Sequence, residues 1–241
     1  ENVATIDFEK EGKDAEKIIS YITGESKSVA CEIANREING ETVLSIKNMN
    51  YGKFLKDISF ELKKGEVLVI GGLAGQGQNE LMLALAGAYP DMKCEAEISG
   101  RKIKLTKPVN AVRNSILLVP GDRQLEGLFL RDSVYTNTIF AKLALKRQPV
   151  FTPTKKYRAE CIQIVKTLSV KTHNIDTPVG KLSGGNQQKV VVGNWLTFDI
   201  NVLLLADPAK GVDIGAKRDL YQYILDMVKE KNTSVILYAS D

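Results

Sequence analysis

Four short, mainly apolar runs that alternate with helical segments constrain the fold of this chain more than any other feature of its sequence. The runs cover residues 66–70, 115–119, 202–205 and 234–238. Each has the length of a strand, and the scarcity of polar residues is typical of strands buried on both faces. Helical segments are expected at residues 79–88, 132–146, 155–169, 186–197 and 214–231. The alternation predicts an α/β fold with a mostly parallel sheet flanked by helices.

The segments outside this alternation indicate further units. Residues 43–46 and 58–62 are strand-like, with a turn at 63–65. The stretch from about 125 to 196 holds helices with no apolar strand between them, so it is interpreted as an inserted helical subdomain. Near the N-terminus we expect a strand at 4–8 and a small helix at 13–23, which together are too small to bury a core. The first residue is not Met and the last predicted strand ends the sequence, so we expect both ends to be cuts in a longer polypeptide.

Composition excludes several function classes. The 241 residues are 44% hydrophobic and 26% charged, which disfavours disorder and coiled coil. A net charge of +4 gives no argument for a nucleic-acid partner. The widely spaced Cys31, Cys94 and Cys161 are expected to be free thiols rather than zinc ligands. The single histidine, His173, makes a His-rich metal site or a Ser-His-Asp triad improbable, so no metal site is predicted on these residues.

A glycine-rich turn follows the first apolar strand and opens a helix. Residues 72–79, GLAGQGQN, have the spacing of the phosphate-binding motif G-x-x-x-x-G-K-[ST], with glycines at Gly72, Gly75 and Gly77. Glycines let backbone N–H groups converge on phosphate oxygens at a helix N-terminus. Gln78 stands where lysine is expected, and Asn79 stands where a hydroxyl would hold Mg²⁺. This segment alone leaves a phosphate site and a simple tight turn almost equally open.

Residues 182–189, LSGGNQQK, form a more specific string. Ser-Gly-Gly before a helix presents a hydroxyl, backbone N–H groups and a positive helix end to an anion. An N-terminal capping role would explain Ser183 but not the whole string.

The string LSGGNQQK resembles the signature loop of ATP-binding-cassette (ABC) ATPases, in the form found in sugar importers. Residues 72–79 then resemble a Walker A loop, and residues 202–213, VLLLADPAKGVD, resemble a Walker B strand and D-loop. Residues 119–123, VPGDR, are similar to the VPEDR segment near the Q-loop in second cassettes of ribose- and galactose-type importers. Four motifs in order identify residues 41–241 as a member of this family.

The resemblance implies a P-loop NTPase fold with an antiparallel β subdomain and the helical subdomain at about 125–196. Importers of this type carry two cassettes in one polypeptide. We therefore expect residues 1–24 to be the C-terminal remnant of a preceding cassette and residues 25–40 a linker. Residues 41–241 would be the second nucleotide-binding domain, truncated at its C-terminus.

Several positions depart from the family pattern. Family Walker B strands end in Asp-Glu, and here Ala206 and Asp207 occupy those positions. Asp207 is therefore the candidate catalytic carboxylate, one methylene shorter than the usual Glu. The Q-loop glutamine position is Gly121 and the switch-histidine position is Ser240. The adenine-stacking aromatic is Tyr51 or Phe54, for which a core or turn role is equally open.

The family pairs its cassettes head to tail, with each nucleotide between the Walker motifs of one and the signature loop of the other. The resemblance and these departures thus imply that the domain's own Walker half is inactive or nearly so, and that it binds ATP and Mg²⁺ weakly or not at all. They also imply that its signature loop serves the nucleotide site on the first cassette. The predicted nucleotide-binding residues are Gly72, Gly75, Gly77, Gln78, Asn79 and Tyr51. The predicted signature-loop residues are Leu182, Ser183, Gly184, Gly185, Asn186 and Gln187, with Asp213 in the D-loop.

The implied partners are the preceding cassette, membrane-embedded permease subunits and, indirectly, a solute-binding protein, with no nucleic acid. Residues 128–130 are a candidate part of the permease-facing surface. The implied location is the cytoplasmic side of the cell membrane, and the transported solute cannot be inferred. The alternatives are a non-transport ABC ATPase acting on nucleic acid or the ribosome, and a structural cassette that does not hydrolyse ATP. A P-loop kinase would leave LSGGNQQK unexplained.

Overall fold

The computed structural model describes residues 40–73, 75–146 and 154–239. The strand expected at 4–8 and the helix expected at 13–23 lie outside the described residues. So do the linker up to residue 39, Cys31 and Ser240.

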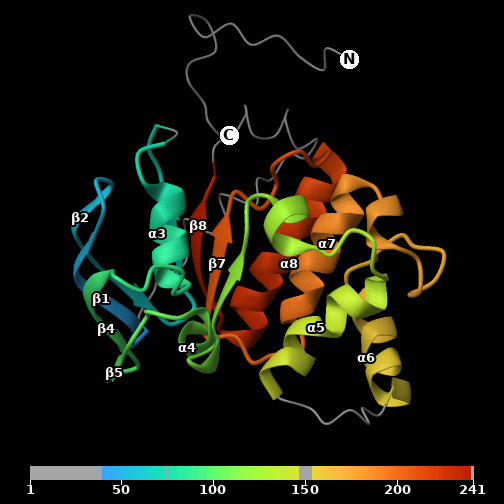
Figure 1. Ribbon diagram of the computed structural model, residues 1–241, viewed down its shortest axis with the longest axis horizontal. Coiled ribbons are helices and arrows are strands. Elements are labelled where there is room, and N and C mark those ends of the chain that lie inside the picture. The colour runs from blue at the N-terminus through green and yellow to red at the C-terminus, as the bar shows by residue number, and fades with distance from the viewer. Residues whose placement is uncertain (1–39, 74, 147–153, 240–241) are drawn as a thin grey trace, which may run out of the picture.

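A four-stranded parallel sheet forms the centre of the molecule, as the apolar runs predict (Figure 1). Its strand order is β3-β8-β7-β6, which places the last strand of the chain between two earlier ones. Each strand is paired in register with its neighbour, for example Val67 with Val235 and Leu117 with Leu203. The strands are β3 (Val67–Ile70), β6 (Ile116–Val119), β7 (Val202–Ala206) and β8 (Ser234–Tyr238).

A second, antiparallel sheet of four strands has the order β2-β1-β4-β5. Strands β1 (Thr42–Tyr51) and β2 (Leu55–Lys63) contain and extend the two predicted strands. Strands β4 (Lys93–Ile98) and β5 (Arg101–Ile103) are absent from the sequence prediction, because their charged residues mask the apolar alternation. β4 forms by pairing with β1 across about 50 residues of chain, which places Leu44 opposite Ile98.

The helices predicted within the described residues are all present, with ends shifted by a few residues. They are α3 (Gln78–Leu85), α5 (Val134–Lys146), α6 (Thr154–Thr167), α7 (Gly184–Trp195) and α8 (Ile214–Lys231). A short helix, α4 (Pro108–Arg113), was not predicted. α3 stops before the expected residue 88 because Gly87, at φ +80°, ends it in a Schellman turn. In that turn the N–H of Ala88 donates to the carbonyl of Leu83 over 2.9 Å.

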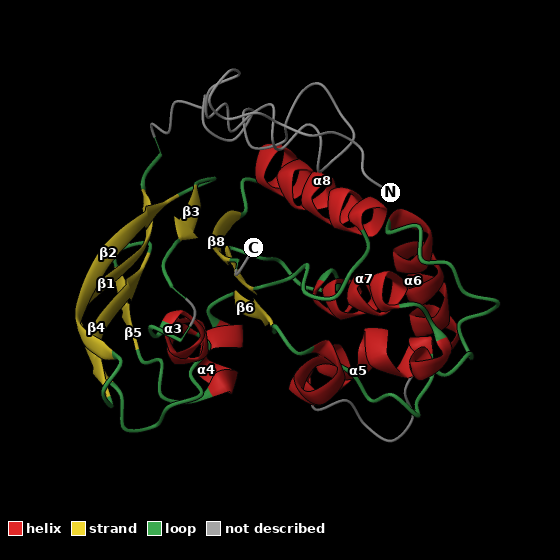
Figure 2. Ribbon diagram, turned by 90° about the horizontal axis from the view of Figure 1, so that it is seen from above, coloured by secondary structure: helices red, strands yellow, loops and turns green. Residues whose placement is uncertain are grey.

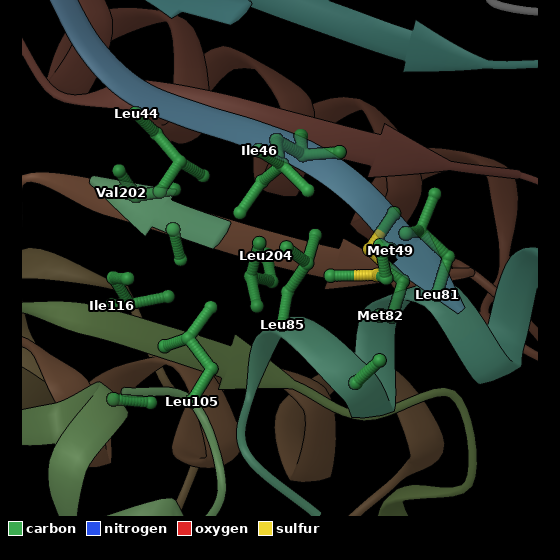
Figure 3. Packing of buried hydrophobic residues seen from close by; sticks show 14 of the residues in the cluster. Leu44, Ile46, Met49, Leu81, Met82, Leu85, Leu105, Ile116, Val202 and Leu204 are labelled. Carbon is green, nitrogen blue, oxygen red and sulfur yellow. The ribbon is translucent and has the colours of Figure 1, made fainter. Parts of the chain in front are cut away.

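Strand β7 divides the core, because alternate residues of a strand face opposite sides of its sheet. Val202, Leu204 and Ala206 face a cluster shared with β1 and α3 (Figure 3). Leu203 and Leu205 face a second cluster shared with α7 and α8. Both faces of the parallel sheet are therefore covered, as predicted.

A third cluster joins α5, α6 and α7 in the predicted helical subdomain, with Ile139 and Cys161 fully buried. Figure 2 shows this subdomain and the antiparallel sheet on opposite sides of the central strands. Cys94 and Cys161 are free thiols, as expected, and burial raises the pKa of Cys161 to about 11. Within the described part of the chain, no helix is both long and apolar enough to cross a membrane.

Candidate functional site

The carboxyl edge of the parallel sheet gathers the residues that the sequence selects. The glycine-rich turn follows β3, Gly121 comes soon after β6, and β7 ends at Ala206. Parallel strands end at one edge, where α/β folds commonly bind their ligands. A Cβ atom added at Gly121 would lie 3.0 Å from the carbonyl oxygen of Ala206. The Q-loop and Walker B positions are therefore in direct contact.

The side chain of Gln78 folds back into the glycine-rich turn. Its Oε1 accepts the backbone N–H of Gln76 at 3.1 Å, and its Nε2 donates to the carbonyl oxygen of Leu73 at 2.9 Å. A Cβ atom at Gly72 would lie only 2.8 Å from that Nε2. With 6% of its surface exposed, the carboxamide is enclosed by the turn. The neutral carboxamide of Gln78 therefore satisfies the backbone N–H of Gln76, a group of the turn that could otherwise face a phosphate.

Ala206, at the expected Walker B metal position, cannot bind Mg²⁺, because its side chain is a methyl group without an oxygen ligand. Ala206 is 2% exposed and packs in the apolar cluster that β1 and α3 share. Among the described residues, no group of three His, Cys, Asp or Glu side chains could hold a metal ion. Asp207 has φ +50°, and its N–H donates to the carbonyl of Tyr238 at 2.7 Å, which fixes its backbone beside β8.

Of the two candidate aromatics, the structure brings Phe54 against the glycine-rich turn. A Cβ atom at Gly77 would lie 3.1 Å from the Cβ of Phe54, whose ring is partly exposed. The ring of Tyr51 stacks instead on Tyr89, with centroids 3.9 Å apart and planes 12° from parallel. Burial, and next the charge of Glu80, raise the pKa of Tyr89. One face of Tyr51 is therefore already covered from within the chain.

The signature string forms the start of α7. Ser183 is exposed at the N-cap position, yet its side chain makes no capping hydrogen bond. Its hydroxyl oxygen accepts Nδ2 of Asn186 at 2.8 Å, and Oδ1 of Asn186 accepts the N–H of Lys171 at 2.7 Å. Gln187 is buried, and its Nε2 donates to the carbonyl of Leu182 at 3.2 Å. Side chains of the string itself thus shape the loop that carries Ser183.

Asp213 caps α8, because its Oδ1 accepts the N–H of Ala216 at 3.0 Å. A Cβ atom at Gly185 would lie 2.5 Å from the Cβ of Ala216, so the first turns of α7 and α8 are in close contact. Ser183, Gly185 and Asp213 consequently line one surface depression. The structure brings the signature and D-loop residues together.

The glycine-rich turn and the signature string begin helices on opposite faces of the parallel sheet. α3 packs with Leu204 in one core cluster, and α7 packs with Leu203 in the other. Both ribbon views show α3 and α7 separated by the central strands (Figures 1 and 2). Within this chain, the signature residues contact the start of α8 and the turn before it.

A groove of about 320 Å³ lies between the segment after β6 and helices α5 and α7. Leu125 and Phe129 are exposed there, and Phe129 meets Phe140 edge-on at 4.7 Å. Buried Asn137 holds Phe129 by accepting its N–H at 2.8 Å and donating to its carbonyl at 3.1 Å. Of residues 128–130, Leu128 and Phe129 line this groove, and Phe140, which the sequence did not indicate, lines it as well. Phe140 lies in a predicted helix, and no local signal shows that its ring reaches this groove.

A parallel sheet with a glycine-rich turn, a Walker B strand and an LSGG-type helix start defines an ATP-binding cassette. The family model of ABC transporters matches residues 55–210, and the chain belongs to this family.

Two similar proteins have names that specify sugar import. The ribose import ATP-binding protein RbsA 1 of Rhizobium johnstonii is 39% identical over 201 residues, which is 83% of this chain and 39% of the relative. The galactose/methyl galactoside import ATP-binding protein MglA of Treponema pallidum is 35% identical over 82% of this chain and 40% of its own length. The chain thus spans about two fifths of each.

A solved structure, CbiO1 from Clostridium perfringens, part of the ABC transporter complex CbiONQ, matches with a TM-score of 0.66. It is 23% identical, and the match covers 83% of this chain and 79% of that one. This likeness supports the fold.

Proposed function

We propose that this chain is the degenerate ATP-binding cassette of a sugar-type ABC importer, paired with a consensus cassette whose ATP hydrolysis powers solute uptake. The relatives support the sugar-import part, since their names specify ribose and galactose/methyl galactoside import. The chain would work on the cytoplasmic side of the membrane, with permease subunits and the preceding cassette as its partners.

The observation that carries the proposal is the carboxamide of Gln78 inside the glycine-rich turn. A phosphate would have to displace it from Leu73 and Gln76 and would then meet no cationic side chain at this position. A unit charge at about 4 Å in a medium of effective dielectric about 20 contributes about 4 kcal/mol before desolvation. With Ala206 at the metal position, this half of the domain has neither the charge nor the metal ligand for hydrolysis.

The signature half keeps the groups that contact phosphate. The hydroxyl of Ser183 is exposed and is not used to cap its own helix. The N–H groups of Gly184 and Gly185 begin α7, where the helix dipole favours an anion. In the head-to-tail pair, these groups would complete the site built on the Walker motifs of the partner cassette.

The groove at Phe129 and Phe140 supports the permease part of the proposal. Exposed aromatic rings held in place by a buried residue such as Asn137 form a preordered apolar surface. Such surfaces mark protein contacts. The groove is lined partly by the helical region at about 125–196, which the family resemblance predicts to contact the permease.

The test compares Ser183→Arg with Gln78→Ala in the assembled transporter. We expect Ser183→Arg to abolish most ATP hydrolysis, because a bulky cation would fill the phosphate-facing loop of the intact site. Gln78→Ala is expected to leave hydrolysis close to wild type. The rate of phosphate release reports both.

Equal effects of the two substitutions would contradict the division of labour. A structural cassette without a trans role predicts that Ser183→Arg is harmless. Turnover by this chain alone, abolished by Asp207→Asn, would show that its own Walker half is active and would overturn the proposal.

A further inference from the structure

The side chain of Arg123 contacts two separate segments of the chain, residues 210–211 and the start of α7. Its Nη1 donates to the carbonyl of Lys210 at 2.7 Å, and its Nη2 donates to the carbonyl of Gly211 at 3.3 Å. Its Nε lies 3.4 Å from Oε1 of Gln187. All three are charge-assisted because the guanidinium is ionised, and the bond to Lys210 is the shortest of them.

The partners of Arg123 belong to both halves of the surface formed by the signature string and the D-loop. Lys210 and Gly211 form the turn between β7 and Asp213, the cap of α8. Gln187 is 4% exposed and donates to the carbonyl of Leu182, directly before Ser183. A Cβ atom at Gly184 would lie 2.7 Å from Nη2, so the first turn of α7 rests on the guanidinium.

The backbone of Arg123 leads towards the aromatic groove. Arg123 opens a short π-helical turn, Arg123–Gly127, which also carries Leu125, 85% exposed at the rim of the groove. Asp122 fixes this turn, because its Oδ1 accepts the N–H groups of Gln124 and Leu125 at 3.0 Å each. The groove rim and the D-loop are thus joined through one capped turn and one side chain.

We propose that Arg123 is a positioning residue that holds the D-loop turn and the start of the signature helix in one fixed arrangement and ties both to the groove rim. The inference rests on the proposed function, in which this surface completes a partner's site. The planar guanidinium suits the task, because it directs several donors at once to carbonyls in fixed places. A lysine would supply a single flexible ammonium group.

The functional test measures kcat and KM for ATP in the assembled transporter. We expect Arg123→Ala to lower kcat about tenfold, since small misplacements of positioned groups are costly. KM should stay near wild type, because the partner's Walker half holds the nucleotide. Arg123→Lys should recover part of kcat. Arg113→Ala, which removes an exposed arginine of α4, is the matched control and should change neither constant.

The structural test uses this chain and does not depend on the transporter. We expect amide hydrogen exchange in Arg123→Ala to accelerate at residues 210–213 and 184–187, and not in Arg113→Ala. Thermal unfolding of each variant is measured alongside. If Arg123→Ala does not fold, Arg123→Lys takes its place in both tests.

The outcomes separate the two proposals. Unchanged exchange at both segments, or the same kcat loss in Arg113→Ala, would overturn the role of Arg123. A fall in kcat matched by an equal rise in KM would also overturn it, because that pattern indicates lost nucleotide binding. If Ser183→Arg leaves ATP hydrolysis unchanged in the same preparation, the proposed function is overturned instead. The hydrogen-exchange result would still show whether Arg123 orders the two segments.

Discussion

At the scale of single residues, Gln78 shows how one side chain changes a binding turn in two ways. It omits the charge that lysine would bring, and it bonds to Leu73 and Gln76 within the turn. The two hydrogen bonds contribute about 1 kcal/mol each net, which is less than the electrostatic term of about 4 kcal/mol. The missing charge therefore reduces the free energy of nucleotide binding more than the need to break these two hydrogen bonds does.

This balance predicts that Gln78→Lys strengthens binding of a fluorescent ATP analogue by this chain about tenfold or more. Gln78→Ala, which empties the turn without adding charge, should give a smaller gain. Gln76→Lys is the matched control, because it places the same charge on an exposed position of the same turn. An equal gain from Gln76→Lys would attribute the effect to net charge rather than to position. No variant should hydrolyse ATP, because Ala206 remains.

At the scale of elements, Asp213 combines two roles that the sequence could not separate. Its place in the D-loop comes from the motif, and its hydrogen bond to the N–H of Ala216 makes it the N-cap of α8. α8 is the longest described helix and packs Leu220, Ile224 and Met227 onto the parallel sheet. Loss of the Asp213 cap would therefore change the stability of the chain as well as its activity.

We expect Asp213→Ala to lower the free energy of unfolding by about 1 kcal/mol, as lost caps commonly do. Asp213→Asn should be nearly neutral, because asparagine caps as well as aspartate. Urea denaturation of this chain measures both. Equal destabilisation by the two substitutions would show that the carboxylate charge matters to stability and not the cap. If Asn is neutral, its effect on transport reports the D-loop role alone.

At the scale of the whole molecule, β7 joins the layers. Leu204 is fully buried in the cluster that β1 and α3 share, and its neighbours Leu203 and Leu205 belong to the cluster under α7 and α8. Figure 3 shows Leu204 among Leu85 and Ile46, residues from three different elements. Loss of packing at this point loosens the antiparallel sheet from the parallel one.

Leu204→Ala is expected to lower the free energy of unfolding by about 2–5 kcal/mol, the range for cavities left in rigid cores. Leu204→Met, which conserves volume, should cost less than about 1.5 kcal/mol. Leu125→Ala is the control at an exposed leucine and should change stability by no more than about 0.5 kcal/mol. If Leu204→Ala lowers the free energy of unfolding by less than about 1 kcal/mol, the packing of Leu204 does not hold the layers together.

The sequence by itself determined the parallel sheet, the long helices, and the identity and order of the motifs at residues 72–79, 182–189 and 202–213. These are local properties, set by periodicity and by residues that are neighbours in the chain. Only the tertiary structure decided that β4 pairs with β1, that Phe54 lies against the turn while Tyr51 stacks on Tyr89, and that Gln78 folds into the turn. It alone brought Arg123 to the carbonyl of Lys210, 87 residues away. Such contacts depend on how the layers pack, and no local pattern encodes which distant atoms a side chain will meet.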